Sequence, residues 1–486
     1  TCRWVRFIPL LGDRTMKRGS TVRNAALRRT RKIALVTLIV GLAAAGLPAQ
    51  AGIDPLGKGR VATPPTPFAS DNVDVLGHIP FGGTVGATFQ GNVMYVTGAE
   101  GLRTFDITDP ASPMPLGALP LSHYENEDVS VEGNTLIIAA GYLEEIVTNI
   151  LYVIDVTDPR LPKLQHVYKY GYAERAAGLA ERVNTHTAEC SPVDCKYVYV
   201  AGGGDIATLE TATGKVVARW GGQVGGTHDL TFDVEGYAWV ASHNGSAAFR
   251  MRPDMTQGDL IARTGASGVG SKTNPLNTFI HHNIERVGAT NTVLITEEDY
   301  NRPRCVQAGY WETWTLDKSL SQSTPASPAA LTNLDFWDTR AGSAPEGAER
   351  QAKNAPLASD DPTADTAAVC SAHWFTTSGS IAAIGWYEQG TRFLDYSDPT
   401  NIRQVGYWDT PTTMTWAAYF APTDPRGEIV YVTDQNRGID VIRFNRSVKP
   451  SVNPVVQSQS EANMIGEAPA GTRPHPTLGW ACPIRL

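Results

Sequence analysis

The stretch that decides the fold is Leu151-Tyr-Val-Ile-Asp-Val-Thr-Asp-Pro159, because the chain repeats it. Close copies run from Leu102 to Pro110 and from Thr391 to Pro399, and the shorter Gly438-Ile-Asp-Val-Ile-Arg-Phe444 ends the series. A phrase that recurs along a chain is the signature of a repeat architecture, in which each copy belongs to one supersecondary unit. The sequence is therefore more informative about architecture than about chemistry.

Each repeat is predicted to contain four short strands. In the second repeat, β-branched and aromatic residues fill the strands, and Gly133-Asn134 and Thr157-Asp-Pro159 provide turns. The predicted strands of this repeat run over residues 128–132, 135–140, 151–156 and 163–168. The repeated phrase is thus the third strand together with the turn that follows it.

The same pattern fits about seven units, over residues 84–119, 126–169, 184–220, 226–264, 280–339, 371–408 and 415–445. The last unit lacks a fourth strand, and residues 72–80 resemble the fourth strands of other units, so this N-terminal segment is predicted to complete it. Such an exchange closes a ring and leaves no open sheet edge. We therefore predict an all-β fold, a seven-bladed β-propeller of four-stranded blades. A β-sandwich, the alternative, explains neither the repeat nor the spare strand.

The repeated phrase resembles the LVIVD-repeat family, whose members are secreted proteins expected to be β-propellers. The resemblance covers most of residues 71–446 and implies the fold and export. It implies no particular activity, because the family has no single one. A more distant resemblance is to the selenium-binding-protein family, seven-bladed propellers that include copper-dependent methanethiol oxidases. The metal motifs of that family have no residue-by-residue match here, so no site residue is taken from it.

Composition divides the chain into four parts. We expect residues 1–51 to hold upstream residues and a signal peptide, 52–70 a Pro-rich linker, 71–446 the propeller and 447–486 a mostly disordered tail. Small and polar residues dominate an insertion at about 301–370 in the fifth blade, which is either a functional lid or a tolerated surface loop. The net charge of −8, without a basic patch, argues against nucleic acid as a partner.

The N-terminal segment is predicted to direct export. Its expected start is Met16, and the basic stretch Arg28–Lys32 precedes an apolar run over 33–45 and the small-residue sequence Ala49-Gln-Ala51. An apolar run of this length is short of the roughly 20 residues that span a membrane, which favours a signal peptide over a membrane anchor. Arg28-Arg29 leaves a twin-arginine signal open. We expect a secreted, extracellular or cell-envelope monomer without a stable membrane span.

Cysteines beyond the N-terminal segment fit an exported protein. Cys190 and Cys195 flank a turn that can bring them within bridging range. Cys305 and Cys370 bracket the insertion and are candidates to clamp its ends, which leaves Cys482 over. Buried free thiols are the alternative interpretation for all of them.

Alignment of the first strands of the units places histidines in one column. The aligned positions hold Glu127, His186, His228, His282, His373 and Trp416, although the chain has only 10 histidines. In a propeller the first strand of each blade lines the central channel, so equivalent positions at its start form a ring at one mouth. The four histidines are therefore predicted to converge from four successive blades.

A ring of imidazoles suggests a transition metal site. Neutral imidazole suits such ions, and copper, or else zinc, iron or manganese, is the expected ion. Three of the four histidines would leave an open position for substrate or water. Asp229 could support a ligand from behind, and His281 competes with its neighbour His282 for the inward position. A metal-free polar ring, inherited by repeat copying, is the alternative.

Further side chains are candidates at the same mouth. Glu297 and Glu298 follow a predicted strand and align opposite His243, although a solvated loop cluster would look the same in the sequence. Glu127 is an additional candidate ligand within the column. Trp416 would either floor a pocket by stacking or fill core space between blades.

Two functions are consistent with these patterns. The first is a secreted metalloenzyme, with metal-dependent oxidoreductase ahead of lyase or hydrolase. The second is a non-catalytic binding or scaffold propeller in extracellular protein or surface interactions. The expected partner is correspondingly a small molecule or an extracellular protein. The sequence assigns no catalytic residue, because it has no nucleophile elbow, phosphate loop, paired-cysteine zinc spacing or EF-hand loop.

Overall fold

The computed structural model describes residues 68–121, 129–143, 146–178, 181–264, 280–298, 309–337, 371–387, 389–410 and 413–448. Almost all regular structure in these ranges is β-strand, apart from one short helix, α1 (Tyr172–Ala176), and a 3-10 turn over Leu320–Gln322. None of the helical segments in these ranges has the length and apolar character that crossing a bilayer requires. The predicted signal peptide, most of the linker, most of the insertion and nearly all of the tail lie outside the described residues.

The strands form four-stranded antiparallel blades that follow one another along the chain. The first three blades consist of β3 (Thr84–Gln90), β4 (Val93–Gly98), β5 (Gly101–Asp106) and β6 (Met114–Pro120); β7 (Val129–Glu132), β8 (Thr135–Leu143), β9 (Ile146–Asp155) and β10 (Lys163–Lys169); and β11 (Thr187–Cys190), β12 (Tyr197–Ala201), β13 (Ile206–Glu210) and β14 (Val216–Trp220). Within each blade the strands pair in chain order.

Three further blades have the same four-stranded arrangement. They consist of β15 (Thr227–Phe232), β16 (Tyr237–Ser242), β17 (Gly245–Met251) and β18 (Gly258–Thr264); β19 (Ile280–Arg286), β20 (Thr292–Glu298), β21 (Trp311–Leu316) and β22 (Ala329–Trp337); and β23 (Phe375–Ser378), β24 (Ile381–Gly385), β25 (Thr391–Asp395) and β26 (Arg403–Asp409). The outer strands β18 and β22 also pair in parallel, and the short β1 (Phe68–Ala69) pairs with β26.

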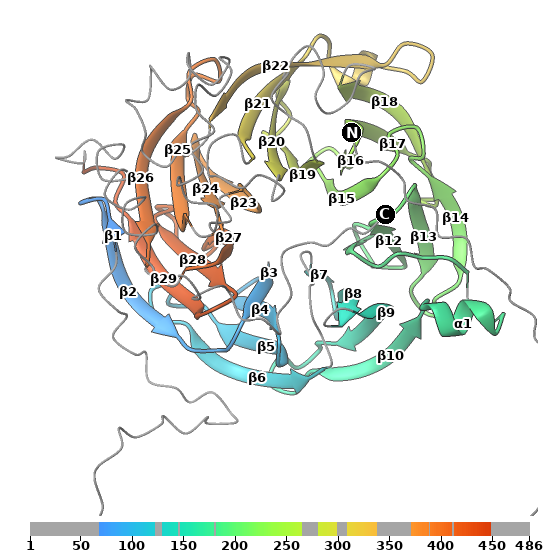
Figure 1. Cartoon of the computed structure of the whole chain (residues 1–486), viewed down its shortest axis with the longest axis horizontal. Helices are drawn as coiled ribbons and strands as arrows, with labels where there is room; N and C mark the ends of the chain where they lie inside the picture. The colour runs from blue at the N-terminus through green and yellow to red at the C-terminus, as the bar shows by residue number, and fades with distance from the viewer. Residues whose placement is uncertain are drawn as a thin grey trace, which may run out of the picture. The chain divides into compact units, whose positions relative to one another are not determined.

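The N-terminal strand completes the last blade. β27 (Thr415–Phe420), β28 (Ile429–Asp434) and β29 (Gly438–Phe444) supply three strands, and β2 (Val73–Ile79) pairs antiparallel with β29 as the fourth. Figure 1 shows the blades arranged radially, with first strands such as β3, β15 and β27 near the centre and β6, β10 and β14 at the rim. This confirms the predicted all-β propeller, its four-stranded blades and its closing strand.

The repeated phrase is apolar on both faces because each blade is packed on both sides. In β9, Leu151 and Val153 pack with Val198 of the following blade. Tyr152 and Ile154 point the other way, into a cluster with residues of the preceding blade. The core of the propeller therefore lies between neighbouring blades.

The first aspartate of each phrase ends a strand and makes a turn. Asp155 Oδ1 accepts a hydrogen bond from the backbone N–H of Thr157 at 2.9 Å. The equivalent bonds at Asp106 and Asp395 measure 2.9 and 2.8 Å. Short polar side chains that bond the backbone two residues on stabilise tight turns. The repeated aspartate therefore has a structural role.

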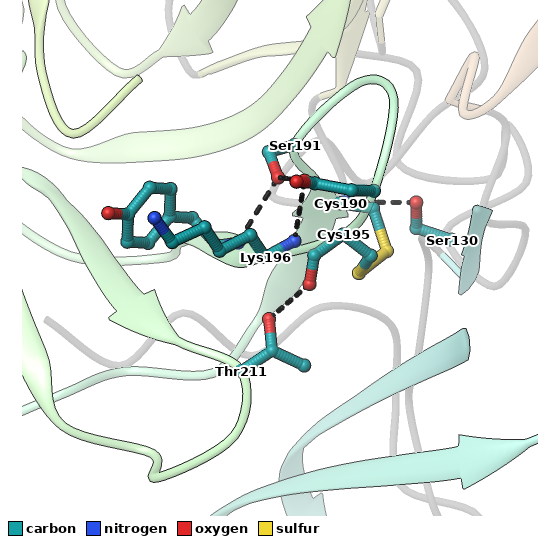
Figure 2. The surroundings of a disulfide bond; sticks show 8 residues. Ser130, Cys190, Ser191, Cys195, Lys196 and Thr211 are labelled. Atoms are coloured by element: carbon teal, nitrogen blue, oxygen red, sulfur yellow. Dashed lines mark hydrogen bonds between the residues drawn. A yellow bond between two sulfur atoms is a disulfide. The ribbon is translucent and has the colours of Figure 1, made fainter. Parts of the chain in front are cut away.

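A disulfide joins Cys190 to Cys195, as predicted. Figure 2 shows its surroundings, where the Cys190 N–H donates to Ser130 Oγ at 3.0 Å and Thr211 Oγ1 donates to the Cys195 carbonyl at 2.5 Å. The bond closes the connection between β11 and β12, and Ser130 links it to β7 of the preceding blade. The other predicted pair, Cys305 and Cys370, lies outside the described residues.

A buried hydrogen bond fastens β2 to β29. His78 Nδ1 is 2.7 Å from Asp440 Oδ1, and Arg437 Nη2 donates to the same oxygen at 2.9 Å. Burial alone would raise the pKa of the Asp440 carboxyl, but hydrogen bonds from His78 and Arg437, and their charges, hold it below its ordinary value. The closing strand is thus held by a side-chain hydrogen bond as well as by backbone pairing.

Asp440→Asn is expected to lower the free energy of unfolding by about 3 kcal/mol at pH 7, because it leaves Arg437 without its buried counter-charge. Since folding lowers the Asp440 pKa, this contribution is complete above about pH 4 and is lost as the pH falls through the folded value. Urea unfolding from pH 7 to pH 3 measures the difference, with the exposed Asp74→Asn on β2 as control. A difference that does not shrink toward pH 3 would contradict this account.

Replacing Cys190 and Cys195 together by serine is expected to lower the free energy of unfolding by about 2 kcal/mol. The reason is that the unfolded chain gains conformational entropy when the short disulfide loop is opened. Reductant should remove a similar amount from the wild-type protein and much less from the double variant. Urea unfolding with and without reductant makes the comparison. A double variant as stable as the oxidised wild type would show that the bond does not stabilise the fold.

Candidate functional site

The aligned histidine column coincides with irregularities in the inner strands. His228 in β15 and His282 in β19 both fall where the register shifts against the second strand of the blade, and Trp416 in β27 does the same. A β-bulge adds an unpaired residue and re-aims its side chain. Each of these side chains is therefore placed by an interruption of the ladder at the start of an inner strand.

The four histidine rings form a continuous arc across neighbouring blades. Ring centroids are 4.4 Å apart from His186 to His228, 4.1 Å from His228 to His282 and 4.0 Å from His282 to His373. Trp416 extends the arc, with its ring 4.2 Å from that of His373. All five side chains are buried. The structure thus brings the aligned positions of five successive blades into mutual contact.

Backbone carbonyls of the next blade fix the tautomers of two rings. His228 Nδ1 lies 3.0 Å from the carbonyl oxygen of His282, and His373 Nδ1 lies 2.8 Å from that of Trp416. A carbonyl only accepts, so each Nδ1 carries the proton and Nε2 of the neutral ring keeps its lone pair. A histidine held in this way is oriented to ligate through Nε2.

Three side chains come close enough to share an ion. His228, His282 and Glu298 each offer one ligand atom, and these atoms all lie within 4.8 Å of one another. His282 Nε2 and Glu298 Oε2 are 3.9 Å apart. Two nitrogen or oxygen ligands at about 2.1 Å from one ion are at most about 4.2 Å apart, so only small side-chain shifts separate this arrangement from a coordination site.

This compact set differs from the four-histidine set predicted from the sequence. It contains two of those histidines and takes its third member from Glu298, which the sequence offered only as an additional candidate. His186 stands beside it, with Nε2 at 2.8 Å from His228 Nε2. His373 adjoins it through the ring of His282.

His282, rather than His281, joins the arc. His281 Nδ1 lies 2.8 Å from Ser246 Oγ, and its Nε2 lies 4.0 Å from Glu312 Oε2. Burial lowers the pKa of His281 to about 3, so the ring is neutral and is stabilised by its contact with Ser246. His281 therefore contributes to packing between blades.

The remaining candidates do not belong to the compact set of His228, His282 and Glu298. Asn283 Nδ2 donates to Asp229 Oδ2 at 3.2 Å, which ties β15 to β19 directly behind the histidines. Glu297 is buried, and its backbone exchanges two hydrogen bonds with Tyr310. Burial and the nearby His186 lower the pKa of His243. Glu127 lies outside the described residues.

Tyr387 is a site residue that the sequence analysis missed. Its hydroxyl donates to Glu298 Oε1, and its ring centroid lies 5.0 Å from that of His373 and 5.4 Å from that of Trp416. It belongs to the turn between β24 and β25, whereas the alignment followed first strands. The signal that could have found it is the corresponding end of the second strand in the preceding blade, where β20 ends at Glu298.

Comparison with known proteins adds little to this description. No family model matches the chain. No curated protein matches its sequence. Among solved structures, the β-propeller domain of Myceliophteria thermophila Cps50 (Swd1) is similar, with 10% sequence identity, a TM-score of 0.49, and coverage of 76% of this chain and 99% of that chain. The propeller assignment rests on the strand pairing described above.

Glu285→Gln is expected to stabilise the protein at alkaline pH. Burial and the charge of Asp229 raise the pKa of Glu285 to about 8. The wild type therefore loses stability as the pH rises from about 4, the unfolded value, through the folded value. The amide cannot ionise, so the variant should be more stable than the wild type at pH 9. Because Glu285 is partly accessible to solvent, the expected gain is only about 1 kcal/mol.

Urea unfolding of both proteins at pH 4 and pH 9 tests this expectation. The advantage of the Glu285 variant should be absent at pH 4. Glu132→Gln, on the inner strand β7, is the matched control for the removal of a carboxylate. Equal stability of wild type and Glu285→Gln at pH 9 would contradict the raised pKa.

Proposed function

We propose that this chain is an exported LVIVD-type β-propeller that binds a transition metal ion through His228, His282 and Glu298. The observation that carries the proposal is the approach of these three buried ligand atoms to within 4.8 Å of one another. Burying two imidazoles and a carboxylate together has a desolvation cost that a bound cation would offset. The Cys190–Cys195 disulfide supports export, because disulfides persist in oxidising compartments.

The ligand set restricts the kind of ion. Two imidazoles and one carboxylate suit copper, zinc, iron or manganese better than calcium or magnesium, which prefer oxygen ligands alone. His228 presents Nε2 because its Nδ1 is bonded to a carbonyl. His186 and His373 flank the set and are available as further ligands after side-chain movement. A three-residue set leaves a coordination position for a small molecule or water.

The activity we propose is that of a metal-dependent oxidoreductase acting on a small molecule. A bound ion of this kind supplies redox or Lewis-acid chemistry. The chain contributes orientation through the fixed tautomers of His228 and His373. It also limits water around the ligands, since Trp416 and Tyr387 are buried against the arc.

The wild-type protein, reconstituted with copper, zinc, iron or manganese and then dialysed, is expected to retain about one equivalent of at least one of these ions. His228→Ala and His282→Ala should each lose most of it, because each removes one of three ligands. Elemental analysis measures the content. His166→Ala is the matched control, since His166 is exposed on the outer strand β10. Retention below about a tenth of an equivalent of every ion by the wild type would overturn the proposal.

A further inference from the structure

We propose that Tyr387 is a positioning residue of the candidate metal site, and that it holds Glu298 so that a single carboxylate oxygen faces the histidines. The inference rests on the proposed metal site and adds to it a residue outside the ligand set. It also specifies how the carboxylate would bind and which ions the site would prefer.

The two oxygens of Glu298 have different neighbours. The Tyr387 hydroxyl donates to Oε1, whereas Oε2 lies 3.9 Å from His282 Nε2. The phenol comes from blade six and the carboxylate from blade five, so the hydrogen bond crosses between blades. Because Oε1 is committed to the phenol, Glu298 is prepared to bind an ion through Oε2 alone.

The backbone of Tyr387 is held in an unusual conformation. Its φ is +43°, in the left-handed region that aromatic residues rarely adopt. Reciprocal backbone hydrogen bonds with Thr415, at 3.0 and 2.9 Å, hold this conformation, and Thr415 directly precedes Trp416. Strained conformations that persist only because the surroundings hold them cluster at functional sites. Here the strain falls on the residue whose hydroxyl donates to Glu298.

Packing locks the phenol as well. Tyr387 is fully buried, and its ring lies against those of His373 and Trp416. The hydroxyl therefore cannot swing away from Glu298 without displacing the arc. Outer partners of this kind fix the orientation of a metal ligand, and their loss typically weakens metal binding by about 10–100-fold.

A carboxylate restricted to one oxygen favours compact ions of low coordination number, such as zinc. Ions that accept more oxygen ligands, such as manganese, gain when both oxygens are free to bind. Tyr387→Phe keeps the ring and removes only the hydroxyl. It is expected to raise the zinc dissociation constant by about 10–100-fold and to change the manganese constant much less. A residue with a purely structural role would not change the ratio of the two constants.

The experiment compares zinc and manganese dissociation constants, by competition titration, for the wild type, Tyr387→Phe and Tyr396→Phe. Tyr396 is the matched control, because it is a buried tyrosine of the same blade whose hydroxyl donates to the Gly379 carbonyl at 2.8 Å. Tyr396→Phe should keep the wild-type ratio. Adding Tyr387→Phe to the Glu298→Gln variant should leave the ratio of zinc to manganese constants of that variant unchanged, because the carboxylate on which the hydroxyl acts is already gone.

The outcomes separate the two proposals. A wild-type ratio in Tyr387→Phe, with metal still bound, would overturn the positioning role and leave the metal site standing. The same change of ratio in the Glu298→Gln background would show that Tyr387 does not act through Glu298, and would also overturn the inference. A wild-type protein that binds neither zinc nor manganese would overturn the positioning role, and it would overturn the metal site as well only if copper and iron were not retained either. Thermal unfolding of the metal-free proteins gives an independent check that each variant is folded.

Discussion

The pairing of β2 with β29 is the constraint on which the rest of the structure depends, because it closes the ring of blades. A closed ring sets the spacing between neighbouring inner strands, and that spacing brings successive histidine rings to 4.0–4.4 Å. Without β2, strand β29 would be an exposed sheet edge. The buried contact of Asp440 with His78 and Arg437 holds the closing strand at this position.

Closure also determines how the histidines are oriented. His228 bonds the carbonyl of His282 in the next blade, and His373 bonds that of Trp416 in the blade after it. Each tautomer is therefore set by a neighbouring blade and not by the strand that carries the ring. The register shift at His228 leaves its side chain out of the regular ladder, and the carbonyl of His282 satisfies the ring nitrogen so displaced. The packing of neighbouring blades therefore also sets the orientation of the histidine side chains.

The sequence was enough to predict the propeller and its closing strand, because both follow from local pattern. Leu151 and Tyr152 face opposite blades, so the repeated phrase must be apolar throughout, and Asp155 must turn the chain. The sequence placed His282 in the column but left His281 open as a competitor, since the choice between them depends on the register shift in β19. Tyr387 escaped for a similar reason, because a positive φ at a turn determines where its hydroxyl points.

The distribution of side chains around the axis argues against simple inheritance of the histidine column. Copying alone would scatter histidines over all blades, yet they occupy four adjacent ones. At Trp416 the arc continues into an apolar cluster, in which Val85, at the corresponding register shift of β3, packs with Met414 and Trp416. Glu298 joins the histidines from a second strand that no first-strand repeat would supply. Tyr387 belongs to the apolar cluster and also donates a hydrogen bond to Glu298, so it connects this cluster to the candidate metal site. A one-sided polar arc completed by a carboxylate from outside the repeat column is what selection for a single local site would produce.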